Sequence, residues 1–161
     1  MSVEASEATL GEALGDLRFR QLLVAIDGSA SSELALSAAV VVAKRDGAKL
    51  TLISVSPHTR HWGGGAYIPD VQPEVDKGTE RLLRDTAGRI PEGISVTTLF
   101  RQGKPGPQIV AAAAEGDYDA ILLGARGVGR LGMMLGSVSH YVLHEAPIAV
   151  FVAHAPRRTG R

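Results

Sequence analysis

The sequence predicts an α/β fold, in which a parallel sheet of five strands is covered by helices on both faces. Short apolar runs alternate with segments of helical periodicity along most of the 161 residues, a pattern typical of strands joined by right-handed helical crossovers. Two of the runs, residues 22–26 and 120–123, are apolar throughout, as expected of strands that are buried on both faces. The residues are 45% hydrophobic but only 4% aromatic, which favours close packing of helices on a sheet.

Nine elements are expected in order along the chain. The short apolar runs are predicted to be strands, over residues 22–26, 50–55, 94–100, 120–123 and 148–152. Segments with apolar residues at three- and four-residue spacing are predicted to be helices, over residues 30–44, 75–90, 108–115 and 137–145. The connection over residues 56–72 is longer than usual, so we expect it to be functional or mobile.

Turn and capping residues indicate where these elements begin and end. Asp27 closes the first strand, and Ser29 or Ser31 can cap the helix that follows. Gly47 lies where that helix should end, because glycine adopts the left-handed conformation that often follows a helix. Pro91 follows the second predicted helix, and proline commonly marks the end of a helix.

The strand order follows from which strands tolerate polar residues. The third strand alternates and contains threonines, which is typical of an edge, whereas the first and fourth are apolar throughout and belong in the centre. If those two are neighbours, the sheet has the order 3-2-1-4-5 of a doubly wound, Rossmann-like fold, with a ligand crevice at their carboxyl ends. The fifth strand, residues 148–152, then forms an apolar edge that needs a cover. We expect a homodimer that pairs through it.

Charge and composition exclude several classes of protein. The 17 basic and 17 acidic residues balance, and without a basic excess we expect no nucleic-acid partner. The absence of cysteine excludes a disulfide-rich secreted module. No run approaches the roughly 18 to 20 apolar residues of a membrane span, and the acidic start lacks the order of a signal peptide. We therefore expect a cytoplasmic protein without a membrane partner.

A glycine-rich segment follows the fourth strand and borders the expected crevice. It contains Gly124, Gly127 and Gly136, and Ser137 stands at the start of the next helix. Glycine lets backbone approach a ligand closely, and the free amides at a helix start attract anions. Positive charge in the same segment is supplied by Arg126 and Arg130. The pattern predicts a phosphate site; the alternative is a flexible surface connection with no ligand.

Asp27 leaves the first strand at the same expected crevice. A carboxylate repels phosphates unless a cation such as Mg²⁺ lies between them, or unless it accepts a hydrogen bond from a ribose hydroxyl. Both roles are compatible with its position, and Asp27 is the candidate metal ligand of the sequence. The alternative is that this acid serves only the positive end of the following helix.

Two pairs of histidines have spacings that occur in metal sites. His58 and His61 lie in the long connection without a carboxylate partner, so we expect them to be exposed. His140 and His144 stand four residues apart in the last predicted helix and could share one face. Because two ligands do not complete a zinc site, we interpret them as surface residues or as a pair near a dimer interface.

From about residue 19 to residue 154 the sequence resembles the universal stress proteins. The opening motif is LLVAIDGS at residues 22–29, and the closing motif is GARG at 124–127 followed by LGSVS at 135–139. Similar residues also occur at Gly103-Lys104-Pro105 and from Asp119 to Gly124. The resemblance implies a universal stress protein domain over residues 19–154, between an extension at 1–18 and a tail at 155–161. It also implies the five-stranded fold and a dimer through the last strand.

In the nucleotide-binding branch of the family, the resemblance implies ATP held by the glycine motif. Ala25 and Ile26 would line the edge of the nucleotide, and Asp27 would lie near the phosphates or ribose, with or without Mg²⁺. The adenine would contact the backbone at Val55 and in the neighbourhood of Leu123. The ribose and phosphates would be held by Gly124, Gly127, Gly136, Ser137 and Val138, with Arg126 as a countercharge.

The glycine motif departs from that pattern in one respect. Residues 128–135, between its second and third glycines, are one residue fewer than the nucleotide-binding pattern has. We therefore carry two hypotheses. One is an ATP-binding stress-response sensor or regulator, a weak ATPase at most because no residue clearly positions a water or acts as a general base. The alternative is a ligand-free dimeric interaction protein of the same fold. A phosphotransfer enzyme on this fold is a third, less favoured hypothesis.

Overall fold

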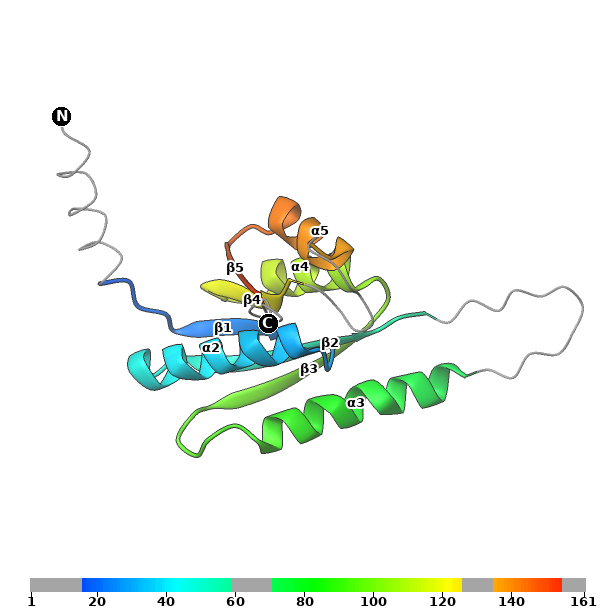
Figure 1. Ribbon diagram of the computed structural model, residues 1–161, viewed down its shortest axis with the longest axis horizontal. Helices are drawn as coiled ribbons and strands as arrows, with labels where there is room; N and C mark the ends of the chain where they lie inside the picture. Colours follow the sequence, from blue (N-terminus) through cyan, green and yellow to red (C-terminus); the bar gives the residue numbers. More distant parts are fainter. Residues whose placement is uncertain (1–15, 59–70, 126–134, 155–161) are drawn as a thin grey trace, which may run out of the picture.

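The computed structural model describes residues 16–58, 71–125 and 135–154, and these form three layers with a parallel sheet in the middle (Figure 1). The strands lie in the order β3-β2-β1-β4-β5, which confirms the predicted fold class and order. In chain order they are β1 Gln21–Ala25, β2 Lys49–Ser56, β3 Val96–Gln102, β4 Ala120–Gly124 and β5 Ala149–Ala153. The helices of the described residues are α2 Ala30–Asp46, α3 Gln72–Gly88, α4 Pro105–Glu115 and α5 Ser137–Glu145.

The helices cover the sheet in pairs, with α2 and α3 on one face and α4 and α5 on the other (Figure 1). Side chains alternate between the two faces along each strand. In β1, Leu22 and Val24 pack toward α2 and α3, whereas Leu23 packs toward α4 and α5. Because both faces of β1 and β4 are covered, residues 22–25 of β1 and 120–123 of β4 are apolar at every position, as predicted.

Local capping sets the ends of α2. The Ser29 hydroxyl accepts a hydrogen bond from the backbone N–H of Ser32 at 3.1 Å, so Ser29 is the N-cap. Gly47 follows the helix with φ of 71°, a conformation that favours glycine, and its N–H donates to the carbonyl of Ala43 at 2.8 Å. The sequence left Ser29 and Ser31 as alternatives for the cap; Ser31 is instead buried against β4.

Three elements start two or more residues away from the predicted position. Helix α4 begins at Pro105 rather than near residue 108, because proline suits the first helical position, where its missing N–H has no partner to lose. Helix α3 begins at Gln72 rather than near residue 75. Strand β3 begins at Val96 rather than at Ile94, although Ile94 still packs against the core.

One carboxylate joins α3 to the carboxyl ends of β2 and β3. Asp76 Oδ1 accepts from Ser56 Oγ at 2.5 Å and from Gln72 Nε2 at 2.8 Å, and Asp76 Oδ2 accepts from Gln102 Nε2 at 2.6 Å. The hydrogen bonds from Ser56 and Gln72 lower the pKa of Asp76, because they stabilise its charged form.

No helix of the described residues is both long and apolar enough to cross a membrane.

Two more carboxylates hold the chain as it enters β1 at the amino end of the sheet. Asp119 Oδ2 accepts from the backbone N–H of Gln21 at 2.8 Å, and Asp46 Oδ2 accepts from that of Phe19 at 3.0 Å. The guanidinium of Arg45 lies against Asp46, with Nε 2.5 Å from Oδ1. The hydrogen bond from Arg45 is the largest cause that lowers the pKa of Asp46 to about 2.

Substitution of Asp46 by asparagine should lower the free energy of unfolding at neutral pH, since the variant loses a charged acceptor for Arg45 and Phe19. Asp46 has a folded-state pKa of about 2, below its ordinary 3.8. Its contribution is therefore present above the higher value and is lost as the pH falls toward the lower one. Urea unfolding of both proteins at several pH values should show a stability gap at pH 7 that narrows between about pH 4 and 2.

The control is Asp117→Asn, which removes an exposed carboxylate close to the same end of the sheet and should leave stability nearly unchanged. A gap for Asp46→Asn that stays constant over the whole pH range would show that the charge of Asp46 does not stabilise the fold.

Candidate functional site

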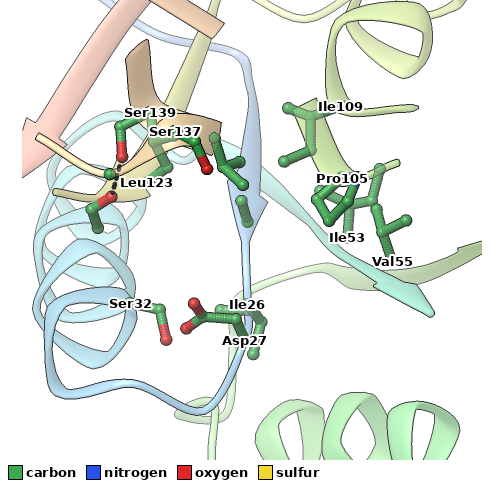
Figure 2. A pocket seen from close by; sticks show the side chains of 14 residues that line it. Ile26, Asp27, Ser32, Ile53, Val55, Pro105, Ile109, Leu123, Ser137 and Ser139 are labelled. Carbon is green, nitrogen blue, oxygen red and sulfur yellow. Dashed lines mark hydrogen bonds between the residues drawn. The ribbon is translucent and has the colours of Figure 1, made fainter. Parts of the chain in front are cut away.

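A pocket of about 160 Å³ lies at the carboxyl ends of β1 and β4, where the strand order reverses (Figure 2). This is the position at which doubly wound sheets bind ligands. Strands β1, β2 and β4 and helices α2, α4 and α5 all contribute, together with the turn after β1. The lining residues are Ala25, Ile26, Asp27, Ser32, Ile53, Val55, Pro105, Ile109, Leu123, Gly124, Gly136, Ser137, Val138 and Ser139.

The pocket brings together nine of the eleven residues that the sequence singled out, although 83 residues separate Val55 from Val138. The other two, Arg126 and Gly127, lie outside the described residues. That the nine residues bind a ligand stays a prediction. Arg130, the second proposed countercharge, is also outside the described part of the chain.

Sequence reasoning missed five lining residues, namely Ser32, Ile53, Pro105, Ile109 and Ser139. Pro105 belongs to the segment Gly103-Lys104-Pro105, which resembles the family but for which the sequence indicated no role in binding. Ser32 and Ser139 sit in the first turns of helices that start at the carboxyl ends of β1 and β4, and that position was the available signal. No local signal marks Ile53 or Ile109, because any core position of β2 or α4 would look the same.

The walls of the pocket differ in chemistry (Figure 2). Aliphatic side chains form one side, from Ile53, Val55, Pro105 and Ile109. The hydroxyl groups of Ser137 and Ser139 lie on another side, and the carboxylate of Asp27 points toward Ser32. Among the described lining residues, Asp27 carries the only charge. The arrangement can accept a molecule with an apolar part and a part rich in hydrogen-bonding oxygens.

The exposed carboxylate of Asp27 also has a structural task. Its Oδ1 accepts from the backbone N–H of Ser29 at 2.9 Å, within the turn that leads from β1 into α2. This hydrogen bond accounts for an acid at this position without any ligand. Among the described residues, no group of three His, Cys, Asp or Glu side chains could hold a metal ion. Asp27 would therefore need a ligand's own oxygens to complete a metal site.

Gly124, at the end of β4, lies at a close approach between the sheet and α2. A Cβ atom there would lie 2.5 Å from Ser31 Cβ and 2.7 Å from the backbone nitrogen of Ser32, which is far inside contact distance. From the sequence, we expected this glycine to allow close approach of a ligand. The structure shows that α2 occupies the space of the missing side chain, so the glycine serves helix packing as well as lining the pocket.

The start of α5 is attached to the end of β4 by hydrogen bonds. Ser139, only 2% exposed, donates its hydroxyl toward the carbonyl of Gly124 at 2.8 Å and that of Ala125 at 3.0 Å. The N–H of Gly136 donates to the carbonyl of Ala125 at 2.7 Å. Among the described residues, no side chain caps the N-terminus of α5, which leaves the N–H groups of its first turn for solvent or a ligand.

Comparison with known proteins identifies this architecture. The Universal stress protein family matches the sequence over residues 18–154. The chain belongs to the universal stress protein family. The Universal stress protein YxiE of Bacillus subtilis (strain 168) is 35% identical over 145 residues, which cover 82% of this chain and 98% of YxiE.

Two solved universal stress protein structures have the same fold. One, a universal stress protein in complex with cAMP, superposes with a TM-score of 0.66 at 22% identity, covering 87% of this chain and 100% of the other. The second is a universal stress protein family protein from Arabidopsis thaliana with AMP bound, with a TM-score of 0.62 at 17% identity. This second superposition covers 85% of this chain and 92% of the Arabidopsis chain. At these identities the likeness extends to the fold alone.

In this universal stress protein, substitution of Gly124 by alanine should destabilise the fold by about 1–3 kcal/mol, as overpacking of a filled interior does. The added methyl group would clash with the backbone of α2, and the clash can be relieved only if the start of the helix moves. The free energy of unfolding from urea titration measures the effect.

The matched control is Gly78→Ala, on the exposed side of α3, where a Cβ meets no atom within 4 Å. That change should be neutral or should stabilise the protein by up to about 1 kcal/mol, since alanine has the higher helix propensity. Equal effects of the two substitutions would contradict the packing role of Gly124.

Proposed function

We propose that this universal stress protein binds an adenine nucleotide, ATP in the first instance, and acts as a stress-response sensor or regulator. The observation that carries the proposal is the pocket at the sheet reversal, in which the opening motif and the closing motif meet. Relatives whose structures hold cAMP and AMP support it, because they have the same fold. The binding domain spans residues 19–154 in this proposal.

The chemistry of the walls suggests how a nucleotide would lie. The aliphatic side would receive the adenine, with the backbone at Val55 and Leu123 contacting its edge. The uncapped first turn of α5 would direct its N–H groups, with the hydroxyl of Ser137, toward ribose or phosphate. The cavity is smaller than the roughly 300–1,000 Å³ of typical ligand pockets, so the phosphates would extend beyond it.

Asp27 would lie beside the ribose or the phosphates. It is the only charged side chain among the described lining residues, and its negative charge would repel phosphates. ATP would therefore need Mg²⁺ between Asp27 and the phosphates, or Asp27 would instead accept a hydrogen bond from a ribose hydroxyl. Phosphate recognition would then rest on backbone amides and on Arg126. Such a site needs no basic surface, which agrees with the neutral net charge.

Hydrolysis of ATP should be slow at most. The described lining residues include no histidine, lysine or cysteine, and the carboxylate of Asp27 already accepts from the backbone of Ser29. We therefore propose that binding itself, through a change in shape or partner choice, carries the signal.

The second candidate is a dimeric interaction protein without a ligand, favoured by the glycine motif that is one residue short. Both candidates include a homodimer that pairs through residues 148–152. Support for it comes from β5, which lies at the edge of the sheet and leaves the side chain of Phe151 47% exposed. Pairing between two such edges would satisfy the backbone groups that β5 leaves open.

Calorimetric titration with ATP, in the presence and absence of Mg²⁺, separates the two candidates. The sensor predicts saturable binding, which Gly136→Phe should abolish because residue 136 is buried in the pocket wall. The control Gly78→Phe lies on the exposed side of α3 and should leave the affinity unchanged. The absence of binding to the unmodified protein at roughly millimolar ATP would reject the sensor in favour of the ligand-free protein.

Light scattering at micromolar concentration tests the dimer. Phe151→Lys should shift the protein to a monomer, since lysine on an edge strand opposes pairing with another edge. The matched control is Val41→Lys on α2, an equally drastic change at a residue that is 66% exposed and is not part of the edge strand. A monomeric unmodified protein, or a dimer that persists in Phe151→Lys, would contradict pairing through this strand.

A further inference from the structure

Helix α5 carries two histidines on the same exposed face, one turn apart. The rings of His140 and His144 have centroids 4.6 Å apart, with their planes inclined by 55°. Both residues are exposed. Their adjacency follows from the helix itself, because residues four apart lie above one another on one face.

Neither ring has a role in the fold or in the pocket. His140 and His144 are absent from the pocket lining. Within the described part of the chain, the two rings contact each other, and neither imidazole takes part in a hydrogen bond or ion pair. By contrast, the carboxylate of Asp76 has its oxygens engaged by three donors. The imidazole nitrogens are therefore open to a ligand from solution.

Two neutral imidazoles in this arrangement suit a transition-metal ion. Imidazole nitrogen binds Zn²⁺, Cu²⁺ and Ni²⁺ well, and two histidines four apart on a helix are a known zinc-binding spacing. With Zn–N bonds of about 2.1 Å at a tetrahedral angle, the two ligand nitrogens lie about 3.4 Å apart, a separation compatible with ring centroids 4.6 Å apart. His144 is also in the last turn of α5, where the negative end of the helix dipole favours a cation.

We propose that His140 and His144 chelate one divalent transition-metal ion, of the class of Zn²⁺, Ni²⁺ and Cu²⁺, on the outer face of α5. Water completes the coordination, so the site is open and exchangeable rather than a closed structural zinc site. It is separate from the Asp27 site, whose carboxylate oxygens suit Mg²⁺. The ion links two turns of α5, the helix whose N-cap Gly136 and first residues Ser137 and Val138 line the pocket. Because the ion binds the folded helix, its binding stabilises the folded protein.

The test uses the full chain without an added polyhistidine sequence. Calorimetry with ZnCl2 and NiCl2 should show one ion bound per chain, and the thermal midpoint should rise with the concentration of either metal. MgCl2 should show no binding at this site, because Mg²⁺ prefers oxygen ligands. A response to Mg²⁺ equal to that to Zn²⁺ would overturn the proposal.

Variants locate the ion. His140→Gln and His144→Gln should each weaken Zn²⁺ binding at least about 10- to 100-fold, the loss that even an outer-shell change causes in metal sites. Both residues are exposed, so the variants should fold, and far-ultraviolet circular dichroism verifies that they do. The matched control removes the other closely spaced pair, His58→Gln with His61→Gln, and should leave Zn²⁺ affinity unchanged.

Imidazole NMR gives a second measure that does not depend on substitution. Resonances of His140 and His144 should shift together on addition of Zn²⁺, while that of His154 stays in place. If the single variants bind Zn²⁺ as the unmodified protein does, or if the control pair abolishes binding, the ion lies elsewhere and the proposal is wrong.

Discussion

The close approach of α2 to the end of β4 is the constraint on which the rest of the site depends. At Gly124 the first turn of the helix lies where a side chain would otherwise stand, so the backbones of β4 and α2 are in direct contact. The same few residues hold α5, through the hydroxyl of Ser139 on the carbonyls of Gly124 and Ala125. They also hold β5, because the N–H of Ala125 donates to the carbonyl of Ala153 at 2.8 Å. Three elements thus take their positions from the end of one strand.

The two ends of the sheet are stabilised by different chemistry. At the amino end, the carboxylates of Asp46 and Asp119 accept hydrogen bonds from the backbone as it enters β1. At the carboxyl end, Asp76 joins α3 to β2 and β3, but the region between α2, α4 and α5 stays open as the pocket. The first turn of α5, serine side chains and the carboxylate of Asp27 line the polar side of that pocket.

Much of the fold was accessible from the sequence because the signals are local. A strand covered on both faces tends to be continuously apolar, and that pattern in residues 22–25 of β1 and 120–123 of β4 placed both strands in the centre of the sheet. The predicted order followed on the condition that the two are neighbours, which the structure confirms. Ser29 and Gly47 marked the ends of α2 for reasons of local hydrogen bonding and backbone conformation. The start of α4 was predicted too late, because Gly106 and the prolines beside it are typical of a loop, and only the preference of proline for the first helical turn accounts for it.

The sequence by itself determined the elements, their order and most of the residues at the sheet reversal, since periodicity, capping and short motifs act over a few neighbouring positions. Only the tertiary structure decided which distant side chains meet: the wall of Ile53, Pro105 and Ile109, the packing of α2 on Gly124, and the hydrogen bonds of Ser139. It also decided that the rings of His140 and His144 lie against each other on the exposed side of α5. These contacts depend on how helices pack across a sheet, which joins residues far apart in the chain and leaves no local pattern in the sequence.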